Sequence, residues 1–465
     1  MLFHSAPFFW LFAVTFAVYW WALRGQRARN VWLLLASVVF YAHWNAWLVL
    51  LVAFTALFDY WMARWLEDAR SPSARGWLLA GAVALPLGLL AFFKYTNFLV
   101  ELAWSGLAAR GPHPVYDIVL PLGISFYTFE TLSYVVDVYR RRIPAERDAL
   151  DYALFLLFFP HLIAGPIVRP GFFLPQIKAA QRLDWARVEG GARLFLLGLV
   201  KKAVVADQLA QIVDPVFAAP GACATATLWI AVVCYAVQIY CDFSGYSDMA
   251  IGGAQALGIT LPVNFRMPYF AANPAEFWRR WHISLSTWLR DYLYIPLGGN
   301  RKGTAATYRN LLVTMLLGGL WHGAAWTFVL WGAYHGLLLA VHRALPWPAW
   351  TGHRALHPLR VAATFLLVCI GWVFFRARSP GDAWLILGRM FAPATGHVLA
   401  PEVAALVAAI LGAVLAAHLV GTFADLPRIA RRLPAPLAGL AMAAVLLLAQ
   451  LLAPDSGGAF IYFQF

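Results

Sequence analysis

The sequence predicts an all-α protein that crosses a membrane many times. Of its 465 residues, 62% are hydrophobic and 12% are charged, whereas about a quarter of the residues of a soluble domain are charged. The mean hydropathy is +0.68, and many apolar runs approach the roughly 20 residues that a helix needs to cross a bilayer. The net charge of +13 is then expected in cytoplasmic loops and near anionic lipid headgroups, so it does not indicate a nucleic-acid partner.

The first part of the chain predicts five spans of alternating direction. They are expected at residues 7–23, 30–41, 46–63, 77–93 and 115–139. Basic residues follow the first, third and fifth spans, and the positive-inside rule places those three segments in the cytoplasm. Residues 94–114 contain few basic residues and are expected to form an external loop. No basic region precedes the first apolar run, so we expect a retained helix rather than a cleaved signal peptide.

Beyond Arg142 the apolar pattern becomes irregular. Residues 151–168 are interrupted by Pro160-His161 and Gly165-Pro166, which predicts a broken or re-entrant segment. Further spans are expected at residues 192–213, 227–250, 323–341, 361–375, 403–420 and 437–452, and a basic cytoplasmic loop at Arg428, Arg431 and Arg432. The prediction is about eleven membrane segments with short or re-entrant helices, forming one membrane-embedded domain over residues 1–465.

The stretch 277–323 stands out because it is charged and aromatic before it becomes apolar. It opens with Phe277-Trp278-Arg279-Arg280-Trp281-His282 and ends with Gly318-Gly319-Leu320-Trp321-His322-Gly323. Polar groups at membrane depth are costly and often functional, and an imidazole exchanges a proton near neutral pH. We therefore take His322 as a candidate, the alternative being a packed histidine bonded to a carbonyl group. The glycines beside it would let a substrate or another backbone approach closely.

The segment around His282 has two interpretations. Arg279, Arg280, Arg290 and Asp291 accompany it, which fits a solvated cytoplasmic face or amphipathic helix. The same basic residues could hold an anionic ligand such as a phosphorylated cofactor. The two histidines are 40 positions apart, so only the fold could bring them together.

The remaining polar residues favour structural roles. We expect core packing for His161, capping or turns at Asp242 and Asp248, pairing of Glu130 and Asp137 with basic neighbours, and an interfacial Lys201-Lys202 pair. His335 and His342 lack a third ligand nearby, so we expect no metal site. Cys223, Cys234, Cys241 and Cys369 show no zinc-ligand spacing and are expected to be free thiols.

Several ordered blocks of this sequence resemble the membrane-bound O-acyltransferase family. They are Leu120–Phe129, Phe159–Ile167, Tyr240–Asp248, Asn264-Phe265, Phe277–Ser286 with Arg290-Asp291-Tyr292, Gly319–Gly323 and Phe460–Phe465. The resemblance covers essentially the whole chain and is densest from Leu120 to Gly336.

The resemblance implies a ring of helices around a thinned core, with a central tunnel from the cytosolic face to the far side and a catalytic region at about 120–343. The two characteristic histidines of the family fall on His282 and His322, of which His322 is the one regarded as essential. It also implies cytosolic acetyl-CoA as acyl donor, an extracytoplasmic partner acetyltransferase, a polysaccharide acceptor such as alginate, and a multi-pass protein in the bacterial inner membrane.

The chemistry of the residues agrees with acyl transfer. Transfer to a hydroxyl group needs a base and donors for an oxyanion. The hypothesis is that His322 acts as general base or relay, that His282 orients or polarises the thioester, and that Arg279, Arg280 and Arg290 attract the phosphates of coenzyme A. A transporter or flippase and a scaffold subunit of a polymer-export complex are the alternatives.

Overall fold

The computed structural model describes residues 1–106, 114–163, 165–345, 353–423 and 434–452. In these residues the regular structure is helical, apart from one isolated bridge between Cys223 and His397, so the predicted all-α class is confirmed. The predicted basic loop at Arg428–Arg432 and the block Phe460–Phe465 lie outside these ranges. The chain divides into two compact units, residues 1–195 with 246–262 and residues 196–245 with 263–465. That the whole chain is one membrane domain stays a prediction.

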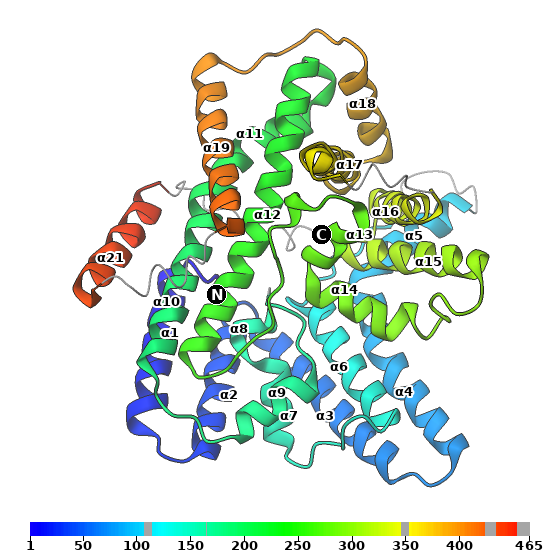
Figure 1. The fold of residues 1–465 in the computed structure, drawn as a ribbon. Helices are drawn as coiled ribbons and strands as arrows, with labels where there is room; N and C mark the ends of the chain where they lie inside the picture. The colour runs from blue at the N-terminus through cyan, green and yellow to red at the C-terminus, as the bar shows by residue number, and fades with distance from the viewer. Residues whose placement is uncertain (107–113, 164, 346–352, 424–433, 453–465) are drawn as a thin grey trace. The chain divides into compact units, whose positions relative to one another are not determined.

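The first unit consists mainly of the N-terminal helices. They are α1 (Ala6–Ala17), α2 (Gln26–Ala42), α3 (Ala46–Asp68), α4 (Pro72–Leu90), α5 (Thr96–Gly106), α6 (Ile124–Tyr139), α7 (Ala149–Leu157), α8 (Phe159–Leu162) and α9 (Pro170–Lys178). Most of α10 (Trp185–Leu199) and the last part of α12 (Thr225–Ala256) complete it. Within this unit α3 packs against α4, α6 and α7, and α2 packs against α7 (Figure 1).

The second unit contains the stretch singled out by the sequence. Its helices are η3 (Val200–Ala206), α11 (Asp207–Ala218), the first part of α12, α13 (Pro274–Arg280), α14 (Ile283–Leu289), α15 (Thr304–His322), α16 (Trp326–Ala344), α17 (His357–Arg376), α18 (Pro380–Phe391), α19 (Pro401–Phe423) and α21 (Ala435–Leu452). Helices α15 and α16 lie side by side as a hairpin, and α17 packs against α16 (Figure 1).

Five helical stretches among the described residues are long and apolar enough to cross a membrane. They are Ala46–Asp68, Pro72–Gly106, Thr225–Ala256, Arg354–Arg376 and Pro401–Gly421. They overlap the predicted spans at 46–63, 77–93, 227–250, 361–375 and 403–420, which are thereby confirmed as membrane-length helices. The total of about eleven stays a prediction.

The prediction of a loop at residues 94–114 is wrong for residues 94–106, which are helical. A π-helical turn at Ala91–Tyr95 joins α4 to α5, and the helix continues to Gly106. Residues 91–105 contain neither proline nor glycine, so their polarity does not interrupt a helix. The next span was predicted from residue 115, but α6 begins only at Ile124 because Pro121 and Gly123, which has a positive φ of 76°, precede it.

The broken segment predicted at residues 151–168 is confirmed. Helix α7 ends at Leu157, α8 is a single turn from Phe159 to Leu162, and residues 166–169 are not helical. Pro160 lies in the first turn of α8, where its missing N–H group costs no helical hydrogen bond.

The interpretations of Lys202 and of the two aspartates of α12 are wrong. The Lys202 side chain is only 1% exposed, and its Nζ lies 2.7 Å from both Asp207 and Asp242. Asp242 and Asp248 lie inside α12, away from both of its ends. A buried ammonium group between two carboxylates is an ion-pair network rather than an interfacial side chain.

Candidate active site

A short polar turn positions His282 between two helices. Helix α13 ends at Arg280, His282 adopts a left-handed backbone conformation (φ 42°, ψ 56°), and α14 starts at the next residue. The Ile283 N–H donates to the Asn264 carbonyl group (2.9 Å), and the N–H and O–H groups of Ser284 donate to Asn264 Oδ1 (3.2 and 2.9 Å). Asn264 therefore holds the backbone on the C-terminal side of His282.

His322 is the last residue of α15, which packs closely against α16. A Cβ atom added to Gly319 would lie 2.3 Å from the Phe328 carbonyl oxygen, and one added to Gly332 would lie 2.4 Å from that of Met315. The glycines therefore let two helix backbones approach each other, one of the two roles that the sequence suggested for the glycines beside His322.

The fold brings the two histidines together. The ring centroids of His282 and His322 are 6.4 Å apart, with 48° between the ring planes. The side chains are 0% and 4% exposed. The 39 residues between them fold back so that the start of α14 meets the end of α15.

Aromatic rings enclose this histidine pair. Phe243 lies 4.6 Å from the His282 ring, and Trp331 and Phe375 lie 5.0 and 5.2 Å from the His322 ring, measured between centroids. All three are buried. They come from α12, α16 and α17, so the enclosure is built from segments far apart in the sequence.

Burial sets the charge state of His282, which lies outside the five candidate spans. Desolvation lowers the pKa of His282 from its ordinary value to about 3, so the imidazole is neutral at physiological pH. A neutral imidazole carries one N–H donor and one acceptor nitrogen. This ring can therefore offer a hydrogen bond without adding a charge to the enclosure.

The three predicted arginines lie in different surroundings. Arg279 is exposed on α13. Arg280 is half-buried and its guanidinium group donates to Glu276 at 2.6 Å. Burial alone would raise the pKa of Glu276, but the Ala272 N–H and Arg280 hold it below its ordinary value. Arg290 is exposed and pairs with Asp291 at 2.7 Å.

The other histidines and acidic residues have structural partners. His335 is buried against Trp278 and Trp331, with ring centroids at 5.2 and 4.9 Å. In the first unit, His161 Nε2 lies 3.5 Å from Glu130 Oε2, and both side chains are buried. The partner predicted for Glu130 among its basic neighbours is therefore wrong.

The same prediction is confirmed for the second acidic residue. Asp137 pairs with Arg142 at 3.3 Å, and the short separation of five positions made this pair readable from the sequence.

Sequence reasoning missed Asn264 and the three aromatic residues that enclose the histidine pair. Asn264 lies within one of the family-like blocks, which was its only signal. Phe243 lies in another of these blocks, Tyr240–Asp248, but nothing in the sequence linked it to His282. Trp331 and Phe375 could not be assigned, because buried aromatic residues are common along the whole chain.

Comparison with known proteins identifies the family. The sequence model of the membrane-bound O-acyltransferase family matches residues 9–346. The probable alginate O-acetylase AlgI of Pseudomonas aeruginosa is 45% identical over 91% of this chain and 81% of its own length. A peptidoglycan O-acetyltransferase of Helicobacter pylori is 39% identical over 78% of this chain and 73% of its own length. A teichoic acid D-alanyltransferase of Bacillus subtilis is 26% identical over 66% of this chain and 80% of its own length. With the family model covering well over half of its residues, this multi-pass membrane protein belongs to the membrane-bound O-acyltransferase family.

Proposed function

We propose that this enzyme transfers an acetyl group from cytosolic acetyl-CoA toward the hydroxyl groups of an extracytoplasmic polysaccharide, alginate or a similar polymer. The observation that carries the proposal is the pair of buried imidazoles 6.4 Å apart inside an aromatic enclosure. The relatives named above, an alginate O-acetylase and a peptidoglycan O-acetyltransferase, support acetyl as the group and a glycan as the acceptor.

In this proposal His322 is the general base. It takes the proton of the attacking hydroxyl group while the hydroxyl oxygen forms a bond to the thioester carbonyl carbon. The carbon–sulfur bond then breaks, and the proton on His322 passes to the leaving thiolate. The net proton count is unchanged, so His322 returns to its starting state, as a base or relay must.

His282 would assist at the carbonyl group. Because its pKa is held at about 3, it serves as a neutral hydrogen-bond donor to the oxygen that becomes negative in the transition state. Donors that are already in place before the reaction stabilise such an oxyanion most effectively.

The donor nucleotide would dock on the cytosolic side. Arg279 and Arg290 are exposed and their guanidinium groups are suited to the phosphates of coenzyme A. Arg280 is the weakest of the three predicted contacts, because its side chain is half-buried rather than exposed and it pairs with Glu276 at 2.6 Å. Arg290 also pairs with a carboxylate, that of Asp291, but is exposed.

The wider arrangement follows the family. We place the protein in the bacterial inner membrane, with about eleven membrane segments in a ring around a tunnel that connects the two faces. An extracytoplasmic partner acetyltransferase would receive the acetyl group and pass it to the polymer. A transporter or scaffold role is less well supported, because the family is one of O-acyltransferases.

The test is transfer of labelled acetyl groups. The purified protein, reconstituted with its partner, is given labelled acetyl-CoA and polysaccharide, and acetylated product is measured. His322→Ala should lower the rate by roughly 10²- to 10⁴-fold, the usual contribution of a general base. His43→Ala, a change at an exposed histidine in the first unit, is the matched control and should keep the rate. Full transfer by His322→Ala would refute the assigned base, and no transfer by the wild type with any acceptor would refute the acetyltransferase itself.

A further inference from the structure

A second concave site lies in the second unit, apart from the histidine pair. It is a pocket of about 580 Å³ between α12, α17 and α19, closed on one side by the turn at Pro268–Phe270. Each of the three helices belongs to a membrane-length stretch. The pocket walls are therefore formed by apolar helices of membrane length.

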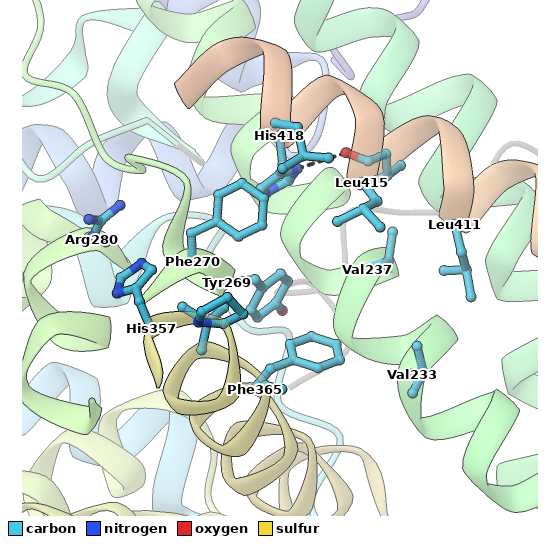
Figure 2. Close-up of a pocket in the computed structure, with 15 residues that line it drawn as sticks. Val233, Val237, Tyr269, Phe270, Arg280, His357, Phe365, Leu411, Leu415 and His418 are labelled. Atoms are coloured by element: carbon cyan, nitrogen blue, oxygen red, sulfur yellow. Dashed lines mark hydrogen bonds between the residues drawn. The ribbon is translucent and has the colours of Figure 1, made fainter. Parts of the chain in front are cut away.

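The two ends of the pocket differ in chemistry. Figure 2 shows Arg280 and His357 together at one end, and Val233 and Leu411 at the other. The wall between them is aliphatic and aromatic, including Phe365. His418 is also in the wall, but its Nδ1 bonds to the Val414 carbonyl oxygen at 3.0 Å within its own helix. Arg280 and the exposed His357 thus lie at one end, and His418 is a polar residue of the wall between the ends.

The dimensions suit an extended hydrocarbon chain. The pocket follows α17 from His357 to Phe365, a distance of about 12 Å at 1.5 Å per residue. A charged or strongly polar solute would lose its hydration along such a wall without gaining partners. An acyl chain has no hydrogen bonds to water to lose there.

The polar end suits a phosphate group. The Arg280 side chain is 33% exposed. Its Nη2 donates to Glu276 and its Nη1 donates to the Met267 carbonyl oxygen at 3.5 Å. A guanidinium group has five N–H donors, so others are left for a second oxygen ligand. His357 is exposed at the start of α17. A guanidinium group beside an imidazole is a typical partner for a phosphate oxygen.

We propose that this pocket binds an anionic membrane phospholipid, with one acyl chain between α12, α17 and α19 and its phosphate held by Arg280 and His357. Arg280 then belongs to a lipid site rather than to the donor site. Because Arg280 ends the helix that leads into His282, the bound lipid would also stabilise the backbone that presents this histidine. The lipid site itself does not depend on the proposed acetyl transfer.

The test measures lipid binding directly. The delipidated full-length protein in detergent is titrated with dioleoylphosphatidylglycerol or dioleoylphosphatidylcholine, and bound lipid is counted by native mass spectrometry alongside thermal unfolding. We expect one phosphatidylglycerol to be retained and to raise the unfolding temperature more than phosphatidylcholine does. His357→Gln and Arg280→Gln should each weaken phosphatidylglycerol binding by about fivefold, since one basic group near a membrane contributes on that order.

A matched pair of variants tests the chain-binding part. Ala362 lines the pocket, whereas its neighbour Ala363 is also exposed but lies outside the lining. Ala362→Phe should fill the pocket and reduce binding roughly tenfold, as overpacking of a fitted site does, while Ala363→Phe should bind lipid like the wild type. Equal binding by the two variants would refute the pocket as the site of the acyl chain.

Further arms separate the lipid from other occupants. Inorganic phosphate and coenzyme A at millimolar concentration should not displace the phosphatidylglycerol. Displacement by either would show that Arg280 binds a soluble phosphate compound and would refute the lipid site. Equal retention of both lipids would refute the preference for an anionic headgroup. A dimer that excludes lipid from the wild type would instead identify a second copy of the chain as the occupant.

Discussion

His282 adopts a left-handed backbone conformation (φ 42°), as does Met267 (φ 44°) on the neighbouring segment. For residues other than glycine this conformation costs on the order of 1–3 kcal/mol and persists only where the surroundings enforce it. Hydrogen bonds join the two segments that contain these residues. The Arg266 N–H donates to the Arg280 carbonyl oxygen at 3.0 Å, and Asn264 accepts from the backbone N–H groups of the two residues after His282. The turn that presents this imidazole is therefore fixed before any substrate arrives.

The buried state of His282 makes stability depend on pH. Its pKa is about 3 in the folded protein and about 6.5 in an unfolded chain. Between these values the unfolded state binds more protons, so the free energy of unfolding falls as the pH decreases, by up to about 1.4 kcal/mol per pH unit. Unfolding temperatures measured in detergent from pH 7.5 to 5 should drop for the wild type and drop less steeply for His282→Asn, which keeps a residue tolerant of the left-handed region. Parallel curves would show that His282 titrates normally.

Lys202 carries a different kind of prediction, because it neutralises two buried carboxylates. Lys202→Met removes the ammonium group that lies 2.7 Å from both Asp207 and Asp242, and we expect a loss of about 3–5 kcal/mol in the free energy of unfolding. Chemical denaturation of the reconstituted protein measures it.

Two controls accompany that variant. Lys201→Met removes a half-buried lysine whose ammonium group lies 5.7 Å from the Tyr240 ring centroid, an interaction worth about 0.5–1 kcal/mol. The combination of Lys202→Met with Asp207→Asn and Asp242→Asn should recover much of the loss. If Lys202→Met and Lys201→Met are equally mild, the network does not contribute to stability.

At the scale of single residues, the sequence identified a candidate functional residue but not the contact partners of the buried charged residues. His322 could be singled out because a polar group in an apolar run is costly. Lys202 was misinterpreted because one of its partners, Asp242, is 40 positions away on another helix. The partner of Glu130 was missed for the same reason, since His161 reaches it only through the fold.

Among the helices, the α15–α16 hairpin determines where His322 lies. The two backbones meet at Gly319 and Gly332, and neither position has room for a side chain. Small residues at such crossings let helices in membranes pack closely. The hairpin thus fixes the end of α15, and with it the distance to His282.

Gly332→Ala tests this packing. The new Cβ atom would lie 2.4 Å from the Met315 carbonyl oxygen, so the helices must move apart, at a cost of roughly 1–3 kcal/mol. We expect a lower unfolding temperature and slower acetyl transfer. Gly388→Ala on α18 is the matched control, because nothing lies within 4 Å of its Cβ position, and replacing a glycine inside a helix by alanine stabilises it by up to about 1 kcal/mol. A Gly332→Ala protein as stable and active as Gly388→Ala would contradict the hairpin argument.

Helix existence was readable from the sequence, whereas helix boundaries were not. Hydropathy located the spans around residues 46–63 and 227–250, because long apolar runs have few alternatives in a membrane protein. It stopped the fourth span at Phe93, although the helix continues to Gly106. Polar residues mark where a helix leaves the membrane, but proline, glycine or a capping residue marks where the helix itself ends.

For the whole molecule, charge predicts which face each loop occupies. The stretch Pro72–Gly106 starts beside basic residues assigned to the cytoplasm and has 35 residues, about 52 Å of helix against a hydrocarbon thickness of about 30 Å. Its far end should therefore project from the opposite face.

Site-directed labelling checks this orientation. The four native cysteines are buried, so an introduced cysteine can be read with little background. Ser105→Cys should react with a membrane-impermeant maleimide in intact cells, and Ser73→Cys should react only in inverted membrane vesicles; both positions are exposed. The reverse pattern would invert the topology and would place the proposed donor arginines on the wrong face.

The aromatic enclosure of the histidine pair has a consequence for the energy balance of the cell. A thioester is thermodynamically ready to react with water, and water is far more abundant than any polysaccharide hydroxyl group. Phe243, Trp331 and Phe375 pack around the two imidazoles and leave them at most 4% exposed. If acetyl-CoA is the donor, we expect these rings to keep water from the bound thioester until an acceptor binds. The enzyme could then hold its donor without the wasteful hydrolysis of acetyl-CoA.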